Sequence, residues 1–131
     1  MPAIRNRSLR WRVSGALLLG AAGVLAFAPF GWFPVNWLTL GGLYALLGAE
    51  ADGERRARHG ALLGAAFAFG LFLAGVSWVY VSLSVFGGMP AGLAALATVL
   101  FCVVLTIFPA LAGALFVRLA AAGWLPRTLL F

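Results

Sequence analysis

Residues 60–117 read GALLGAAFAFGLFLAGVSWVYVSLSVFGGMPAGLAALATVLFCVVLTIFPALAGALFV, a stretch without a charged residue. As one α-helix it would be about 87 Å long, whereas the hydrocarbon core of a bilayer is about 30 Å thick. An unpaired charge in that core costs roughly 2.5–3.5 kcal/mol, so the long uncharged stretch favours membrane spans. The Phe-Gly-Gly-Met-Pro segment at residues 86–90 predicts a turn. We therefore expect two spans, 61–83 and 91–117, with a kink in the second at Pro109.

Residues 13–49, nearer the N-terminus, form another stretch without a charged residue. It would make a helix of about 55 Å, again too long for a single crossing. Two prolines that flank a glycine in residues 29–34 predict a turn, because proline lacks the amide donor and restricts the residue before it. This stretch therefore predicts two further spans, 13–28 and 35–48.

The composition supports an all-α integral membrane protein. Mean hydropathy is +1.07, 64% of residues are hydrophobic and 9% are charged, against about 25% charged residues in soluble domains. The net charge of +6 would suggest nucleic acid in a soluble chain. Here the basic residues, all of them arginine, flank apolar spans, so the sequence predicts no nucleic-acid partner.

The arginines also predict the orientation of the four spans. They lie in residues 1–12, in the loop 49–60 and from Arg118 onward, and the two turns hold none. Because cytoplasmic loops of membrane proteins are rich in Lys and Arg, we expect two hairpins with both ends in the cytoplasm. Residues 1–12 would be a cytoplasmic N-terminus, residues 13–119 the four-span region, and residues 120–131 a cytoplasmic segment that leads toward a fifth span.

One alternative at the N-terminus is a cleaved signal peptide. Basic residues, an apolar stretch and Ala26-Phe27-Ala28 resemble a cleavage site of the A-x-A type. Proline follows that site directly and further apolar spans come after it, so we favour a retained first span.

No catalytic or metal-binding group of residues is apparent. Residues 60–117 lack the ionisable side chains that mark ion and proton paths in membranes. Cys102 is the only cysteine and lies among apolar residues, where its thiolate is disfavoured, so we predict a packing role. His59 has no second His or Cys nearby and is predicted to be a loop residue. The sequence predicts no metal and no cofactor.

Polar side chains gather at the outer end of the third predicted span. Ser77, Tyr80 and Ser84 share one helical stripe, and Trp78 and Ser82 share a second. One hypothesis is a site for a lipid headgroup or a partner domain. The alternative is an interfacial aromatic belt whose hydroxyls bond to their own helix backbone.

Small residues recur at four-residue spacing in three of the predicted spans. The pairs and triplets are Ala16 with Gly20, Gly60 with Gly64 and Ala68, and Ala110 with Ala114. Such spacing allows helices to approach closely. A lipid-shaped groove between the helices would have the same pattern, and the sequence leaves both interpretations open.

The chain resembles the N-terminal membrane region of bacterial apolipoprotein N-acyltransferases. The resemblance rests on Trp78-Val79-Tyr80-Val81-Ser82, on Phe86-Gly87-Gly88-Met89-Pro90, and on similar strings at residues 25–30 and 69–72, all in the same order and spacing. It implies an inner-membrane protein that acts in the last step of lipoprotein maturation. The site residues that match the family are Trp78, Tyr80, Ser82, Phe86, Gly87, Gly88, Met89 and Pro90.

The resemblance implies a reaction that moves an acyl chain from a membrane phospholipid to the terminal amine of a diacylglyceryl-modified apolipoprotein. A Glu-Lys-Cys triad in a nitrilase-like domain would carry it through a thioester, which splits one acyl transfer into two easier steps. This chain contains no lysine and ends at Phe131. We therefore expect an N-terminal portion without catalytic residues, inactive alone, whose matching residues form a surface for lipid access or domain support.

Two other interpretations remain at this stage. The first is a complete four-span transporter, although such proteins usually need an ionisable residue within their spans. The second is a non-catalytic membrane scaffold that binds a separate subunit.

Overall fold

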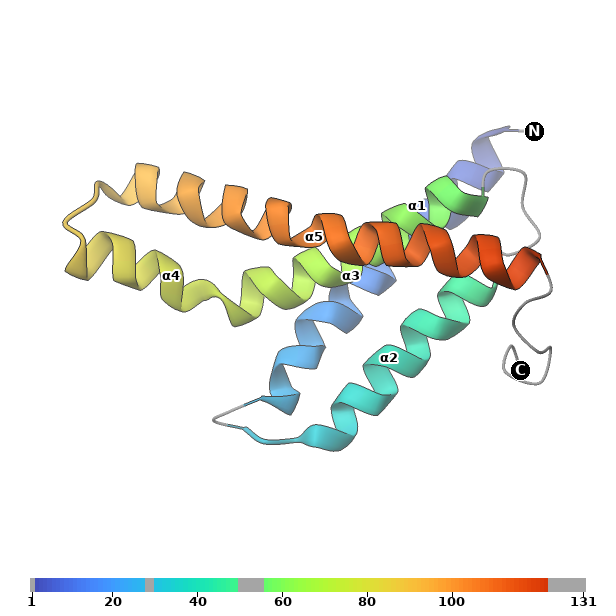
Figure 1. Cartoon of the computed structure of the whole chain (residues 1–131), viewed down its shortest axis with the longest axis horizontal. Helices are drawn as coiled ribbons and strands as arrows, with labels where there is room; N and C mark the ends of the chain where they lie inside the picture. The colour runs from blue at the N-terminus through green and yellow to red at the C-terminus, as the bar shows by residue number, and fades with distance from the viewer. Residues whose placement is uncertain (1, 28–29, 50–55, 123–131) are drawn as a thin grey trace.

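The computed structural model describes residues 2–27, 30–49 and 56–122, which form helices joined by short turns (Figure 1). The elements are α1 (Pro2–Gly23), the 3₁₀-helix η1 (Val24–Ala26), α2 (Phe33–Gly48), α3 (Arg56–Gly75), α4 (Ser77–Val81), the π-helix η2 (Ser82–Phe86) and α5 (Ala91–Ala121). Residues 28–29 of the first predicted turn, 50–55 of the predicted loop and 123–131 lie outside the described residues.

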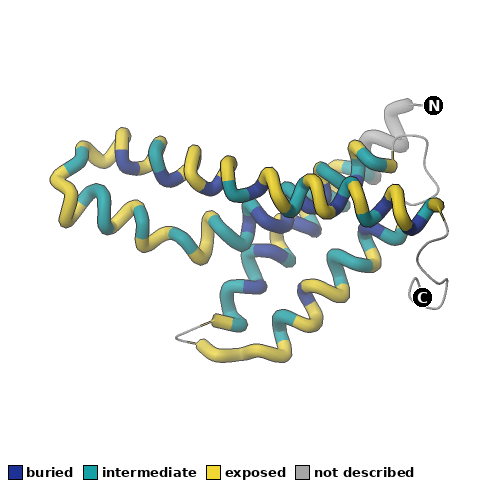
Figure 2. The backbone as a smooth tube through the Cα atoms, viewed as in Figure 1, coloured by how far each residue is buried: buried dark blue, intermediate teal, exposed yellow. Residues whose placement is uncertain are grey.

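Two helical hairpins share one end of the molecule and diverge toward the other. The α1–α2 hairpin and the longer hairpin of α3, α4 and α5 point in different directions (Figure 1). Helix α3 is central, because it makes the two largest helix–helix interfaces, with α5 and with α1. Buried residues concentrate where these helices cross, whereas the tip formed by α4 and the start of α5 is mostly exposed (Figure 2).

The small core lies in the shared half of the molecule. Its fully or nearly buried members come from four helices: Ala16, Leu47, Leu63, Phe67 and Val117. Elsewhere the large apolar side chains point outward, and Trp37 is 77% exposed while Phe86 is 84% exposed. A protein in water rarely exposes apolar surface on this scale, so these faces are suited to hydrocarbon.

Glycines bring the helix backbones into direct contact. A Cβ atom on Gly60 would lie 2.5 Å from the carbonyl oxygen of Gly113, and one on Gly113 would clash with the carbonyl of Gly60. Likewise, a Cβ atom on Gly20 of α1 would clash with the backbone carbonyl of Phe67, and one on Gly70 of α3 would clash with that of Leu17. The small residues therefore act in packing, as predicted for Gly20, Gly60 and Gly64. On α5 the contact is made by Gly113, which was not predicted, and by the backbone of Pro109 and Ala110 beside Gly64.

The two turns use glycine where a left-handed backbone is required. Gly31 has φ +64° and Gly88 has φ +63°, a region that costs other L-residues about 1–2 kcal/mol. In the first turn the Trp32 amide donates to the carbonyl of Leu25 at 3.0 Å. Pro34 then lies in the first turn of α2, where its missing amide is not needed.

Several helix limits differ from the sequence-based expectations. Helix α1 begins at Pro2, so it includes most of the segment 1–12 that precedes the first predicted span, because arginine is a good helix former and a helix can extend beyond the membrane. For the same reason α3 includes Arg58 and His59, which were expected in a loop. Helix α5 continues through Pro109 over 31 residues.

Three helical segments are long and apolar enough to cross a membrane: Leu9–Ala26, Arg56–Gly75 and Ala91–Ala121. Helix α2 has 16 residues, or about 24 Å, which is shorter than the hydrocarbon core of about 30 Å. The described part of the chain is thus an all-helical membrane protein, and the fourth crossing stays a prediction.

Candidate functional site

The third predicted span is interrupted just before the residues that carry the family resemblance. Helix α3 ends at Gly75, and Val76 leaves helical geometry with φ −100° and ψ 10°. Helix α4 follows and becomes a π-helix at Ser82, where the Gly87 amide donates to the Ser82 carbonyl at 2.9 Å. Such π-turns are rare and occur often at functional sites. The predicted site residues therefore stand on an irregular segment that is distinct from α3.

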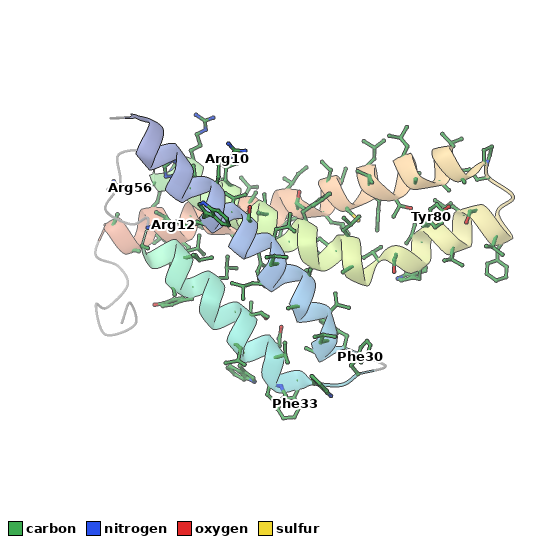
Figure 3. The ribbon with its side chains drawn as sticks, turned by 180° about the vertical axis from the view of Figure 1, so that it is seen from behind. Arg10, Arg12, Phe30, Phe33, Arg56 and Tyr80 are labelled. Carbon is green, nitrogen blue, oxygen red and sulfur yellow. The ribbon has the colours of Figure 1, made fainter. Side chains whose placement is uncertain are left out.

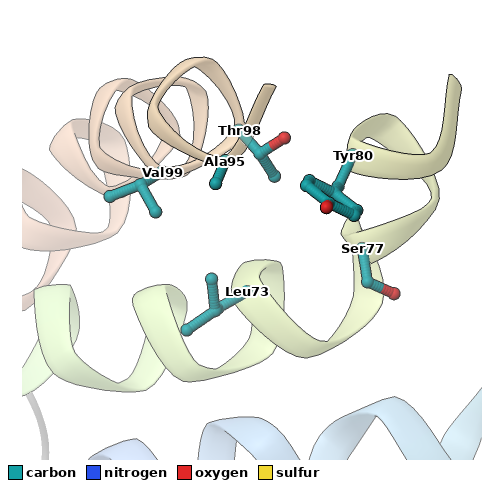
Figure 4. A pocket seen from close by; sticks show the side chains of 6 residues that line it. All are labelled: Leu73, Ser77, Tyr80, Ala95, Thr98 and Val99. Atoms are coloured by element: carbon teal, nitrogen blue, oxygen red, sulfur yellow. The ribbon is translucent and has the colours of Figure 1, made fainter. Parts of the chain in front are cut away.

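This irregular segment turns its aromatic residues in two directions. Trp78 and Phe86 are 65% and 84% exposed on the outer surface. Tyr80 instead lines a cavity between this segment and α5 (Figure 4). The residues predicted as one surface thus divide into an exposed aromatic face and a cavity wall.

The cavity has a volume of about 220 Å³. Its lining consists of Leu73, Ser77, Tyr80, Ala95, Thr98 and Val99. The predicted stripe is therefore partly confirmed, because Ser77 and Tyr80 do share one wall (Figure 4). Trp78, Ser82 and Ser84 do not line this cavity.

Two hydroxyl groups that line the cavity, and the hydroxyl of Ser84 outside it, donate to backbone carbonyls three or four residues earlier in the chain. Ser77 donates to the carbonyl of Ala74 at 3.3 Å, Ser84 to Tyr80 at 2.8 Å and Thr98 to Ala94 at 2.8 Å. This is the arrangement that the aromatic-belt interpretation predicts. A cavity with such a lining offers shape and apolar contact, and it has no carboxylate, imidazole, amine or thiol among its lining residues.

The wall contributed by α5 was not predicted from the sequence. Thr98 is 5% exposed and belongs to a buried row with Ala94, Cys102 and Thr106. These residues recur at every fourth position, which is the spacing of a single helical face, and that spacing was the available signal. Cys102 is fully buried in this row, as expected for a packing role.

The arginines that the structure describes gather at the opposite end from this cavity. Arg10, Arg12 and Arg56 lie together at the shared end of the hairpins, far from Phe30 and Phe33 at the first turn (Figure 3). Among the described residues, no group of three His, Cys, Asp or Glu side chains is placed to hold a metal ion.

A family model and several curated proteins match this chain. The family model for the apolipoprotein N-acyltransferase N-terminal domain matches residues 19–131. An apolipoprotein N-acyltransferase of Ralstonia nicotianae is 45% identical over 90% of this chain and 22% of its own length. One of Nitrosomonas europaea is 46% identical over 79% of this chain and 20% of its own, and one of Coxiella burnetii is 44% identical over 75% and 19%.

The molecule is therefore a bacterial membrane protein built from apolar helices. The chain belongs to the apolipoprotein N-acyltransferase family and matches its N-terminal domain. It spans about a fifth of the length of the curated relatives that it matches. Family membership does not favour the transporter and scaffold interpretations.

Proposed function

We propose that this chain forms the N-terminal membrane portion of an enzyme that transfers an acyl chain from a phospholipid to the N-terminal amine of a lipidated apolipoprotein. The single observation that carries the proposal is the match of the family model to residues 19–131. The described residues supply apolar helices, turns and a cavity without a carboxylate, imidazole, amine or thiol among its lining residues. Because the chain spans about a fifth of the length of its relatives, we propose that the reaction needs residues outside 1–131 and that this chain alone does not acylate.

A chimera tests this function. Residues 1–131 replace the matching part of the Ralstonia nicotianae relative, and the protein is expressed in cells depleted of their own enzyme. We expect the chimera to acylate lipoproteins, seen as the added acyl mass on the N-terminal peptide, whereas the 131-residue chain alone leaves that mass unchanged. A thioester trapped on the isolated chain, or a folded chimera without activity, would contradict the proposal.

We further propose that Trp78, Tyr80, Ser82 and residues 86–90 form a surface for lipid access or domain support. Phe86 is 84% exposed and contributes little to packing within the chain, so a partner or lipid would account for its exposure. In the chimera, Phe86→Ala is expected to lower the acylation rate about tenfold or more, since burial of a Phe side chain is worth roughly 1.5–3 kcal/mol. The matched control is Phe108→Ala, because the Phe108 side chain on α5 is also largely exposed, at 73%. Equal rates for both variants would refute the role of this surface.

The proposed orientation has both ends of the chain on the cytoplasmic side of the inner membrane and both turns outside, with four crossings. It is supported by the gathering of arginines at one end of the hairpins (Figure 3). In a Cys102→Ala background, a membrane-impermeant maleimide is expected to label Phe86→Cys in intact spheroplasts and Arg58→Cys only after permeabilisation. Labelling of Arg58→Cys from outside would overturn this orientation.

A further inference from the structure

A second and larger cleft lies among α2, α3 and α5, and extends from Leu47 and Phe116 near the arginine end to Phe72, next to Leu73 of the first cavity. Its volume is about 500 Å³, within the range of roughly 300–1,000 Å³ typical of small-molecule sites. Leu43 and Leu47 of α2, Phe67 of α3, and Ala112 and Phe116 of α5 contribute to its wall. Tyr44 adds the only polar hydroxyl among its lining residues.

The hydroxyl of Tyr44 is buried and has no hydrogen-bond partner within the described residues. Its ring packs edge-on against Phe116, with centroids 5.2 Å apart and an interplanar angle of 68°. Buried hydroxyls in proteins nearly always have a partner. Tyr44 is four residues from the end of α2, about 6 Å along the helix axis, which is close to the end where the arginines lie. The missing partner is a hydrogen-bond acceptor that lies close to the hydroxyl of Tyr44, near this end of α2.

Exposed arginines lie at the end of the helices toward which the cleft extends. Arg56 and Arg58 occupy the first turn of α3, and Arg118 occupies the last turn of α5, two residues beyond Phe116. Gly64, which lines the cleft, is eight residues from Arg56, or about 12 Å along the helix. Basic groups above an apolar cleft between helices match the amphipathic shape of an anionic phospholipid.

We propose that this cleft holds one anionic phospholipid from the leaflet on the arginine side. An acyl chain fills the apolar cleft, a glycerol ester oxygen accepts a hydrogen bond from Tyr44, and the headgroup phosphate lies among the arginines. The lipid is a structural ligand and not the acyl donor, because its headgroup lies at the arginine end of the helices, whereas Tyr80, which belongs to the surface proposed above for lipid access, lies at the opposite end (Figure 3).

The test measures phosphatidylglycerol bound to the whole 131-residue chain by native mass spectrometry after delipidation in mild detergent. The wild-type chain is expected to keep one phosphatidylglycerol and to prefer it to phosphatidylcholine. Ala112→Phe is expected to fill the cleft and to abolish retention, because Ala112 lines the cleft while its own surface is exposed. Ala45→Phe, at an exposed position of α2 outside the lining, is the matched control and keeps the lipid.

Tyr44→Phe separates lipid binding from a purely structural role. If the hydroxyl bonds to the lipid, its removal weakens phosphatidylglycerol binding about fivefold. If the hydroxyl has no partner, its removal leaves binding unchanged and raises thermal stability, and this result would overturn the proposal. Equal lipid retention by wild type, Ala112→Phe and Ala45→Phe would also overturn it.

Discussion

Replacing Gly113 with alanine is expected to lower the free energy of unfolding by about 3 kcal/mol, the upper part of the range for overpacked interiors. A Cβ atom at this position would clash with the backbone carbonyl of Gly60. A carbonyl in a helix cannot rotate away as a side chain can, so α3 and α5 must separate. This is the largest helix–helix interface in the described chain, and its loss should be visible as a lower midpoint in a denaturation series in detergent.

Gly92→Ala on the same helix is the control for this experiment. Gly92 has no atom within 4 Å of a built Cβ, and alanine is a better helix former than glycine by about 1 kcal/mol. The control should therefore be neutral or slightly stabilising, so the two variants differ in the sign of their effect. If Gly113→Ala also proves neutral, the close backbone contact between α3 and α5 is wrong.

The sequence was sufficient to predict the elements that depend on charge and on turn residues. Long stretches without a charged residue predicted the apolar helices, since the core of a soluble protein does not contain uncharged stretches of this length. Gly88 and Pro90 located the second turn because a left-handed glycine and a proline at the start of a helix are local requirements. The start of α5 at Ala91 therefore agreed with expectation to the residue.

The limits of α1 and α3 depended on properties that charge does not report. Arg10, Arg12 and Arg58 are inside helices, because a helix can extend from the membrane into the headgroup region without losing its backbone bonds. The irregular geometry at Val76 could not be predicted from a proline or a charged residue, because neither lies next to it in the sequence. Gly75 was the only local indication, and glycine is common within membrane helices.

The candidate site was predicted for one wall only. Ser77 and Tyr80 were found because hydroxyls are conspicuous in an apolar segment. Thr98 lies on a helix eighteen residues further along, and only the three-dimensional pairing of α4 with α5 brings it to the same cavity. Periodicity identifies the buried face of a helix but does not tell which helix covers it.

The second large effect is expected where α1 crosses α3. Gly20 faces the carbonyl of Phe67, and Gly70 faces the carbonyl of Leu17, so each helix presses a glycine against the backbone of the other. Gly20→Ala and Gly70→Ala should each lower the free energy of unfolding by about 2–3 kcal/mol. Gly15→Ala on α1, where a Cβ meets nothing within 4 Å, is the control and should be neutral or stabilising.

The double variant provides the stricter test of this crossing. Either alanine alone forces α1 and α3 apart, and the separation makes room for the second methyl group. The combined loss should therefore be smaller than the sum of the single losses by about 1 kcal/mol or more, a coupling expected only for residues in one contact. Strictly additive losses would mean that the two glycines act at independent places, and the reciprocal contact between α1 and α3 would have to be abandoned.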